Sequence, residues 1–172
     1  MSTTYNTRYA SSPEAVKKYD TTALRDEFLI NDLMKEGEIN LTYTHYDRYI
    51  AGSAVPKSNL KLETIDPLKA AFFLERREMG IINVGDSGAV EVDGVSYSLG
   101  HKDALYIGMG AKDVIFKSDD PKKPAKFYIN SAPAHTNFPT TKVSLEEANK
   151  LELGSLETCL LYTSDAADDS LR

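Results

Sequence analysis

The densest group of chemically useful side chains is Glu75, Arg76, Arg77 and Glu78, which directly follows the apolar segment 70–74. These side chains are candidates for binding an acidic sugar, because an arginine can grip a carboxylate with two parallel hydrogen bonds. The other interpretation is an exposed, salt-bridged edge or a contact between subunits. From the residues alone we favour that second interpretation.

A second source of chemistry is the three histidines, His45, His101 and His135, which lie 56 and 34 positions apart. Neither His-x-His nor His-Glu-x-x-His occurs, so no local zinc spacing is present, and three unrelated histidines are the plainer interpretation. His101 and Asp103 share a predicted turn, where they can form an oriented acid–base pair or Asp103 can simply cap the turn. His135 follows Pro133 in a rigid loop that is either an active-site rim or a crossing between two domains.

Composition limits the classes of function that fit. The 172 residues carry a net charge of −6, which does not suggest nucleic acid, since such proteins usually present a basic face. The only cysteine, Cys159, rules out an internal disulfide framework and cysteine-type zinc sites. No apolar run approaches a membrane span, and the N-terminus lacks the apolar core of a secretion signal. We therefore expect one soluble, cytoplasmic domain with no nucleic-acid or membrane partner.

The elements that must position these residues are mostly strands. Asp93-Gly94 predicts a two-residue hairpin turn, and counting outward pairs Val92 with Val95 and Val90 with Tyr97 on one apolar face. Further strand-like segments are 39–44, 49–55, 70–74, 80–84, 104–107, 113–116 and 125–129. Short strands separated by glycine turns predict a mainly β protein, an antiparallel barrel or jelly roll of cupin type.

Helical signals are confined to the ends of the chain. Ser12-Pro13-Glu14 predicts a short helix over 13–19, and 21–32 reads as a helical turn or docking segment. Ser144-Leu-Glu-Glu147 matches a capping box that opens a short helix or turn.

Several longer stretches carry a specific resemblance. They are Leu24-Arg-Asp-Glu-Phe-Leu29, Phe73 to Gly85, Gly100 to Gly108 and Pro124 to Thr136, and they occur in this order. From about Tyr19 to Thr158 the chain resembles the 5-keto-4-deoxyuronate isomerase family. The resemblance implies the first cupin of a two-cupin protein that assembles into homo-hexamers. It also implies a small uronate substrate from pectin breakdown, 5-dehydro-4-deoxy-D-glucuronate, interconverted with 3-deoxy-D-glycero-2,5-hexodiulosonate.

The resemblance also implies where the metal lies. Family members hold zinc with three histidines and a glutamate in the second cupin, so no ligand can be carried over, and no cofactor is expected in this chain. His101 and His135 match family positions without an assigned role. We therefore expect a fragment that is inactive alone. The alternatives are a stand-alone cupin that binds an acidic sugar, or a structural domain that serves assembly.

These observations divide the chain into four expected parts. Residues 1–37 form an N-terminal arm with a short helix, and 38–140 form the cupin-like domain. Residues 141–158 begin a linker to a second cupin. Residues 159–172 resemble a translated sequencing adapter, which would make them an artefact and Cys159 non-native.

Overall fold

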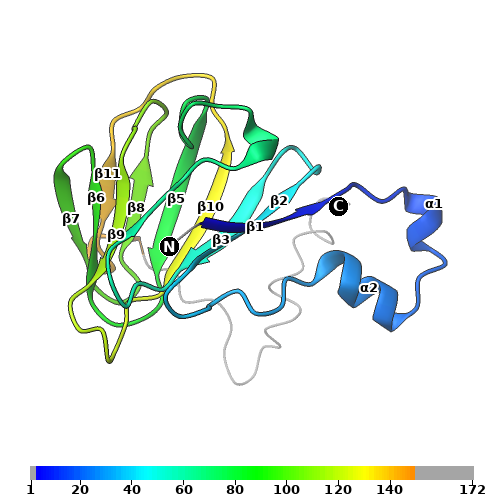
Figure 1. Ribbon diagram of the computed structural model, residues 1–172, viewed down its shortest axis with the longest axis horizontal. Coiled ribbons are helices and arrows are strands. Elements are labelled where there is room, and N and C mark those ends of the chain that lie inside the picture. Colours follow the sequence, from blue (N-terminus) through cyan, green and yellow to red (C-terminus); the bar gives the residue numbers. More distant parts are fainter. Residues whose placement is uncertain (1–2, 150–172) are drawn as a thin grey trace.

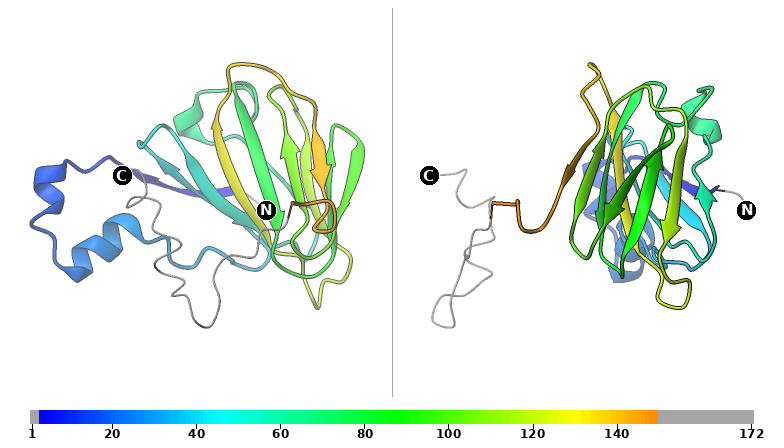
Figure 2. Two further views of the ribbon diagram at one scale, coloured as in Figure 1. Left: turned by 180° about the vertical axis from the view of Figure 1, so that it is seen from behind. Right: turned by 90° about the vertical axis from the view of Figure 1, so that its left-hand side faces the viewer.

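Two β-sheets face one another and enclose the core in the computed structural model, which describes residues 3–149 (Figures 1 and 2). The larger sheet has seven strands in the order β1 (Thr3–Arg8), β2 (Ile39–Thr44), β3 (Ile50–Ala54), β10 (Phe127–Pro133), β5 (Arg77–Asn83), β8 (Ala104–Ile107) and β11 (Thr141–Val143). The smaller sheet runs β4 (Leu60–Lys61), β9 (Val114–Ser118), β6 (Gly88–Val92) and β7 (Val95–Leu99). All strand pairs are antiparallel except β1 with β2. The mainly β, cupin-like fold is as expected, with strands in two separate sheets.

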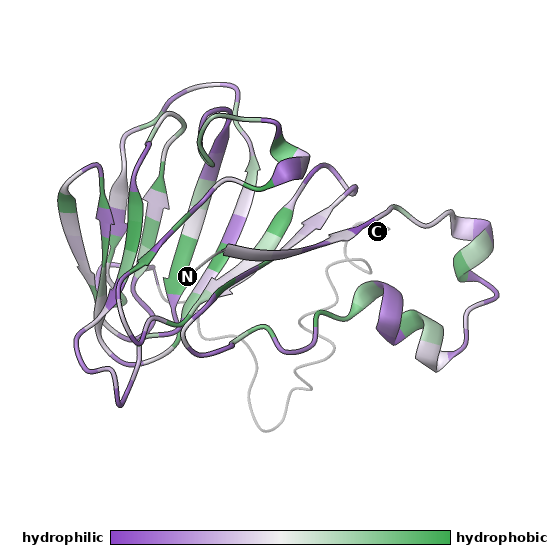
Figure 3. Cartoon of the chain, in the orientation of Figure 1, coloured by the Kyte–Doolittle hydropathy of each residue, from purple (hydrophilic) through white to green (hydrophobic). Residues whose placement is uncertain are grey.

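The core lies between the sheets, where alternate side chains of each strand point inward. Along β5 the residues Arg77, Met79, Ile81 and Asn83 are buried, which is the period of two expected for a strand with one covered face. Phe116 of β9 and Phe127 of β10 are fully buried, and their ring centroids lie 5.5 Å apart. Figure 3 shows apolar residues recurring along the strands of both sheets. This packing joins the two layers.

The predicted hairpin is confirmed in turn and in register. Asp93 and Gly94 have φ of 47° and 86°, as a type I′ turn requires, and Val92 pairs with Val95. Asp93 also accepts hydrogen bonds through Oδ1 from the backbone N–H groups of Lys112 and Asp113, at 3.0 and 2.8 Å. The apolar face is buried in β6, whereas Val95 is 55% exposed because β7 lies at the edge of its sheet.

The expectation of an extended segment over 70–74 is wrong. These residues form bends and a turn, although Phe73 and Leu74 are buried as expected. The backbone of this turn is hydrogen-bonded within itself and to a distant loop, since Glu75 N donates to Phe72 O and Gly110 N donates to Leu74 O. A short apolar run indicates burial more reliably than it indicates a strand.

The two α-helices among residues 3–149 lie in the N-terminal segment, to one side of the sheets (Figure 1). The first, α1 (Pro13–Val16), begins at the predicted Ser12 cap but ends in a turn before residue 19. The second is α2 (Thr21–Phe28), capped by Asp20. Arg8 of β1 ties this segment back through hydrogen bonds to the carbonyls of Glu27 and Leu29, at 2.8 and 2.6 Å.

Both ends of the described chain also contribute strands. β1 and β11 belong to the same sheet as strands from the segment 38–140, and neither was expected from the sequence. The Ser144–Glu147 capping box is present as a turn, with Ser144 Oγ donating to Glu147 at 2.8 Å. The expectations for 150–172, including the adapter-like tail, fall outside the described residues.

Candidate functional site

One end of the larger sheet holds a pocket of about 450 Å³. Three regions meet there: the turn between β2 and β3, the short 3-10 helix η1 (Asp66–Leu68) with its following loop, and the adjacent ends of β5 and β10 (Figure 1). The lining residues are Arg48, Pro67, Leu68, Lys69, Ala70, Phe73, Arg76, Arg77, Pro133, Ala134 and His135. A volume of this size suits a small molecule.

The charge of this pocket has one sign. Arg48, Lys69, Arg76 and Arg77 line it, and no aspartate or glutamate does. Lys69 has an ion-pair partner outside the lining, since its Nζ lies 2.5 Å from Asp66 Oδ1. Both side chains of that pair are more than 70% exposed, so water screens the attraction and it contributes little. The pocket therefore favours an anion.

Arg77 is the buried member of this set and is only 5% exposed. Its Nε donates to Ser131 Oγ at 3.1 Å, and its Nη2 donates to the carbonyls of Arg48 and Ser131 at 2.7 and 2.8 Å. Among residues 3–149 no carboxylate forms an ion pair with it. Burial lowers the pKa of Arg77 to about 10, so the guanidinium still carries its charge at neutral pH.

The other cations stand on turns with unusual backbone geometry. Asp47 and Arg48 have φ of 52° and 54°, and Tyr49 N donates to Tyr46 O at 3.0 Å to close the turn between β2 and β3. Lys69, which ends η1, has φ of 46°. Residues other than glycine held in this left-handed region carry a small strain, and such strain tends to concentrate at functional sites.

Arg76 and His135 complete the rim. Arg76 Nη2 donates to the carbonyls of Lys69 and Leu68 at 2.9 and 3.3 Å, which holds the loop after η1 against the start of β5. The carbonyl of Arg76 accepts from Ala134 N at 3.1 Å, so the segment that carries His135 is fixed beside it. Three of the candidates named from the sequence, Arg76, Arg77 and His135, thus share one pocket.

The two glutamates of the same run do not line the pocket. Glu75 Oε2 accepts from the backbone of Ala71 at 2.6 Å and closes the turn before β5. Glu78 Oε2 accepts from the Tyr106 hydroxyl at 2.8 Å. Burial, followed by this hydrogen bond, raises the pKa of Tyr106 to about 12. Both glutamates therefore support the fold around the site.

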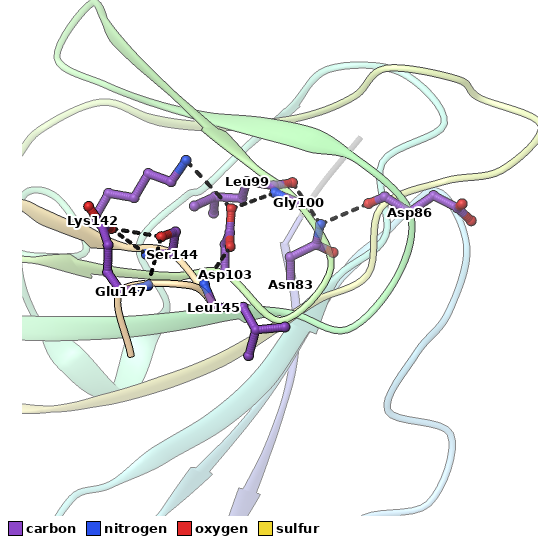
Figure 4. Close-up of polar contacts among 9 residues, drawn as sticks. All are labelled: Asn83, Asp86, Leu99, Gly100, Asp103, Lys142, Ser144, Leu145 and Glu147. Atoms are coloured by element: carbon purple, nitrogen blue, oxygen red, sulfur yellow. Dashed lines mark hydrogen bonds and ion pairs between the residues drawn. The ribbon is translucent and has the colours of Figure 1, made fainter. Parts of the chain in front are cut away.

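His101 and Asp103 lie elsewhere and are not hydrogen-bonded to each other among the described residues. The Asp103 carboxylate accepts from the backbone N–H groups of Leu145 and Gly100, at 3.0 and 2.9 Å, and lies 3.5 Å from Lys142 Nζ (Figure 4). The two backbone hydrogen bonds lower the pKa of Asp103. The exposed His101 ring lies with Nδ1 3.1 Å from Gly85 O. The geometry is that of a turn cap.

Asn83, a residue that the sequence did not single out, organises the neighbouring loops (Figure 4). It is fully buried, and its Nδ2 donates to the carbonyls of Asp86 and Leu99, at 2.8 and 2.9 Å. Its Oδ1 accepts from Gly85 N and Lys126 N, at 3.0 and 3.2 Å. One amide thereby satisfies four backbone groups, a structural role.

The described residues offer no set of metal ligands. Between residues 3 and 149, no group of three or more histidine, cysteine, aspartate or glutamate side chains is placed to hold a metal ion. His45 instead stacks on Tyr9, with ring centroids 4.6 Å apart. The residues present therefore do not fit a zinc centre, and no chemical step is assigned to a metal here.

The two facing sheets define a mainly β protein of the cupin-like class. Residues 28–159 match the KduI/IolB family, and the chain belongs to this family. A 4-deoxy-L-threo-5-hexosulose-uronate ketol-isomerase from Formosa agariphila is 71% identical over 159 residues, covering 92% of this chain and 57% of that protein. A relative of the same name from Lachnoclostridium phytofermentans is 58% identical, covering 87% of this chain and 55% of that protein. The chain thus spans just over half the length of these curated relatives.

Similar solved structures include two cupins. The Schizosaccharomyces pombe Cnp3 cupin domain has a TM-score of 0.43 at 10% identity, covering 59% of this chain and 68% of that chain. A cupin protein from Bacteroides fragilis has a TM-score of 0.36 at 13% identity, covering 61% of this chain and 79% of that chain.

No helix within the described part of the chain is both long and apolar enough to cross a membrane.

Proposed function

We propose that this chain is part of a ketol-isomerase that acts on 4-deoxy-L-threo-5-hexosulose uronate, an acidic sugar released in pectin breakdown. The observation that carries the proposal is the 71% identity to a relative of that name over 92% of the chain. The pocket supports it independently, because its four cations suit a substrate with a carboxylate.

We further propose that the chain does not catalyse this reaction alone. A ketol isomerisation moves a proton between neighbouring carbons, which takes a base, an acid and a group that stabilises the developing oxyanion. The pocket offers cations and the single imidazole of His135. Because the chain covers only 57% of that relative's length, the missing groups belong to a second cupin in this proposal, and that cupin also holds the zinc.

The longer protein is proposed to be cytoplasmic and hexameric. The resemblance to the isomerase family is the ground for both statements. Sedimentation of the full-length protein measures its oligomeric state directly, and a stable monomer at micromolar concentration would contradict the hexamer.

The test compares three proteins in one assay. The 172-residue chain, the Formosa agariphila relative and a chimera that joins residues 1–158 to the remainder of that relative are each given 4-deoxy-L-threo-5-hexosulose uronate, and product formation is followed. The chimera should turn over and the 172-residue chain should not. An inactive chimera beside an active relative would contradict the isomerase proposal, and turnover by the chain alone would contradict the need for a second cupin.

The pocket also favours a second function, in which the chain binds an acidic sugar without chemistry. Calorimetry separates the two: binding by the 172-residue chain together with an inactive, folded chimera would favour the binding module. A third possibility, from the sequence, is a purely structural role in assembly. Light scattering on the chain and on an Arg76→Ala, Arg77→Ala variant tests it, and an unchanged monomer in both would count against it.

A further inference from the structure

The positive charge of the pocket stands out against the rest of the molecule. The whole chain has a net charge of −6, yet all the charged side chains that line the pocket, Arg48, Lys69, Arg76 and Arg77, are cations. They come from three separate segments between positions 48 and 77. A concave surface with charge of one sign concentrates the electric field and attracts ligands of the opposite charge.

We propose that this pocket is a binding site for a small sugar acid, whose carboxylate is held by Arg48, Lys69 and Arg76 above the buried Arg77. The site lies wholly within this chain and needs neither a metal nor a second domain. The choice of a uronate as its ligand rests on the proposed function, whereas the capture of a carboxylate on a carbon skeleton rests on the pocket alone.

The walls of the pocket argue for an organic anion over an inorganic one. Besides its cations and His135, the lining consists of Pro67, Leu68, Ala70, Phe73, Pro133 and Ala134. Such apolar surface gains nothing from a fully hydrated phosphate, but it can cover the carbon–hydrogen faces of a sugar ring or chain. A lining made of cations and apolar side chains matches a carboxylate attached to a carbon skeleton.

Arg77 keeps the site assembled before any ligand arrives. Its hydrogen bonds to Ser131 of β10 and to the carbonyl of Arg48 join the β2–β3 turn to the floor of the pocket. Because those partners are uncharged, the positive charge of Arg77 is not neutralised by them. A charge fixed in place beforehand costs little ordering entropy when a ligand binds.

One nitrogen of the Arg76 guanidinium is hydrogen-bonded to the protein, and the other two can bind a ligand. Both of its hydrogen bonds to the described residues run through Nη2, to the carbonyls of Leu68 and Lys69. Its Nε and Nη1 therefore remain for a ligand oxygen. Lys69 can leave its exposed pair with Asp66 at small cost when a carboxylate competes for it.

The test is calorimetric titration of the 172-residue chain at low salt with galacturonate, galactose and inorganic phosphate. Galacturonate should bind with a dissociation constant of about 1 mM, as a few partly exposed charge contacts allow. Galactose should give no heat, and phosphate should bind at least about tenfold more weakly. Equal binding of phosphate and galacturonate would overturn the proposal, as would no heat from galacturonate at about 50 mM.

Two variants and a matched control locate the ligand. Arg48→Gln and Lys69→Gln each remove an exposed charge, leave the buried Arg77 intact and should weaken galacturonate binding about three- to tenfold. Lys122→Gln removes an exposed charge from the loop between β9 and β10 and should bind like the parent chain. If both pocket variants bound like the parent, the site would lie elsewhere. Circular dichroism of each variant establishes that it is folded.

These results are separable from the proposed function. Galacturonate binding that responds to Arg48→Gln keeps this inference even if the chimera shows no isomerase turnover. An active chimera with no response to the pocket variants keeps the proposed function and overturns the inference.

Discussion

Nη2 of Arg77 donates a hydrogen bond of 2.7 Å to the backbone carbonyl of Arg48, and so joins strand β5 to the turn between β2 and β3. The two arginines are 29 positions apart, and both line the cationic pocket. The contact joins two positively charged residues, and within residues 3–149 no carboxylate forms an ion pair with Arg77. Arg77 therefore stabilises the fold and also supplies positive charge to the proposed binding site.

Arg77→Met should destabilise the chain. The substitution keeps much of the aliphatic volume but removes the donors to Ser131 Oγ and to the carbonyls of Ser131 and Arg48. Leaving buried acceptors without these donors should cost about 2–4 kcal/mol in the free energy of unfolding, measured in urea. Arg76→Gln, at an exposed neighbour, should cost below about 1 kcal/mol. Similar losses in the two variants would contradict the anchoring role of Arg77.

Asp103→Asn should weaken the chain in a pH-dependent way. Hydrogen bonds from Leu145 N and Gly100 N lower the folded-state pKa of Asp103. Its contribution to the free energy of unfolding is therefore complete above the unfolded-state pKa of about 3.9, and it declines as the pH falls through the folded-state pKa. The variant should be about 1 kcal/mol less stable at pH 7, and the difference should shrink below pH ~4. Unfolding in urea at several pH values measures both effects. Asp119→Asn serves as the exposed control, and a difference that stayed constant down to pH ~2 would contradict the assignment.

Glu78→Gln should lower the pKa of Tyr106, which burial and the Glu78 hydrogen bond raise to about 12. A raised tyrosine pKa means that folding favours the neutral form of the side chain. The resulting contribution to the free energy of unfolding is present below about pH 10 and is lost as the pH rises through the folded-state pKa. Titration of carbon-13-labelled tyrosines by NMR, with Tyr106→Phe to assign the signal, follows the change. Because burial is the larger cause, the pKa in Glu78→Gln should stay above that of an exposed tyrosine. An unchanged Tyr106 titration would show that the hydrogen bond has no influence.

Gly88→Ala tests the close packing of β6 against β9 and Ala125. An added methyl group at Gly88 would lie 2.4 Å from Lys117 O and 2.7 Å from the Ala125 side chain. Relief of this overlap requires backbone movement in β6 or β9, which should cost about 1–3 kcal/mol. At Gly100, where the nearest atom would be 3.5 Å away, the same substitution should be nearly neutral. Equal stability of the two variants in urea would contradict the close packing at Gly88.

The parts of the fold that follow from local sequence were predictable. The Asp93-Gly94 turn and its register depend on a few adjacent residues whose backbone preferences and apolar pattern agree. β1 was missed because it is polar, and its place is set by pairing with β2, 36 positions later. The segment 70–74 was misassigned because an apolar run has the same composition in a buried turn as in a strand.

The site was predictable only in part, because local sequence does not show which distant residues the fold brings together. Arg76 and Arg77 drew attention because they are adjacent, and His135 because it follows a rigid proline loop. Arg48 and Lys69 are single cations in separate turns, and only the folded sheet brings them to the same pocket. The one local signal at Arg48 is its place beside Asp47 in a short connection between two strands, which predicts a turn but not a ligand.

The most direct measurement is the rate at which the chimera of residues 1–158 with the remainder of the Formosa agariphila relative isomerises 4-deoxy-L-threo-5-hexosulose uronate. The rate should lie within about tenfold of the relative's own, a barrier difference of about 1.4 kcal/mol. A folded chimera more than about a thousandfold slower would contradict the assignment of this chain to a uronate ketol-isomerase.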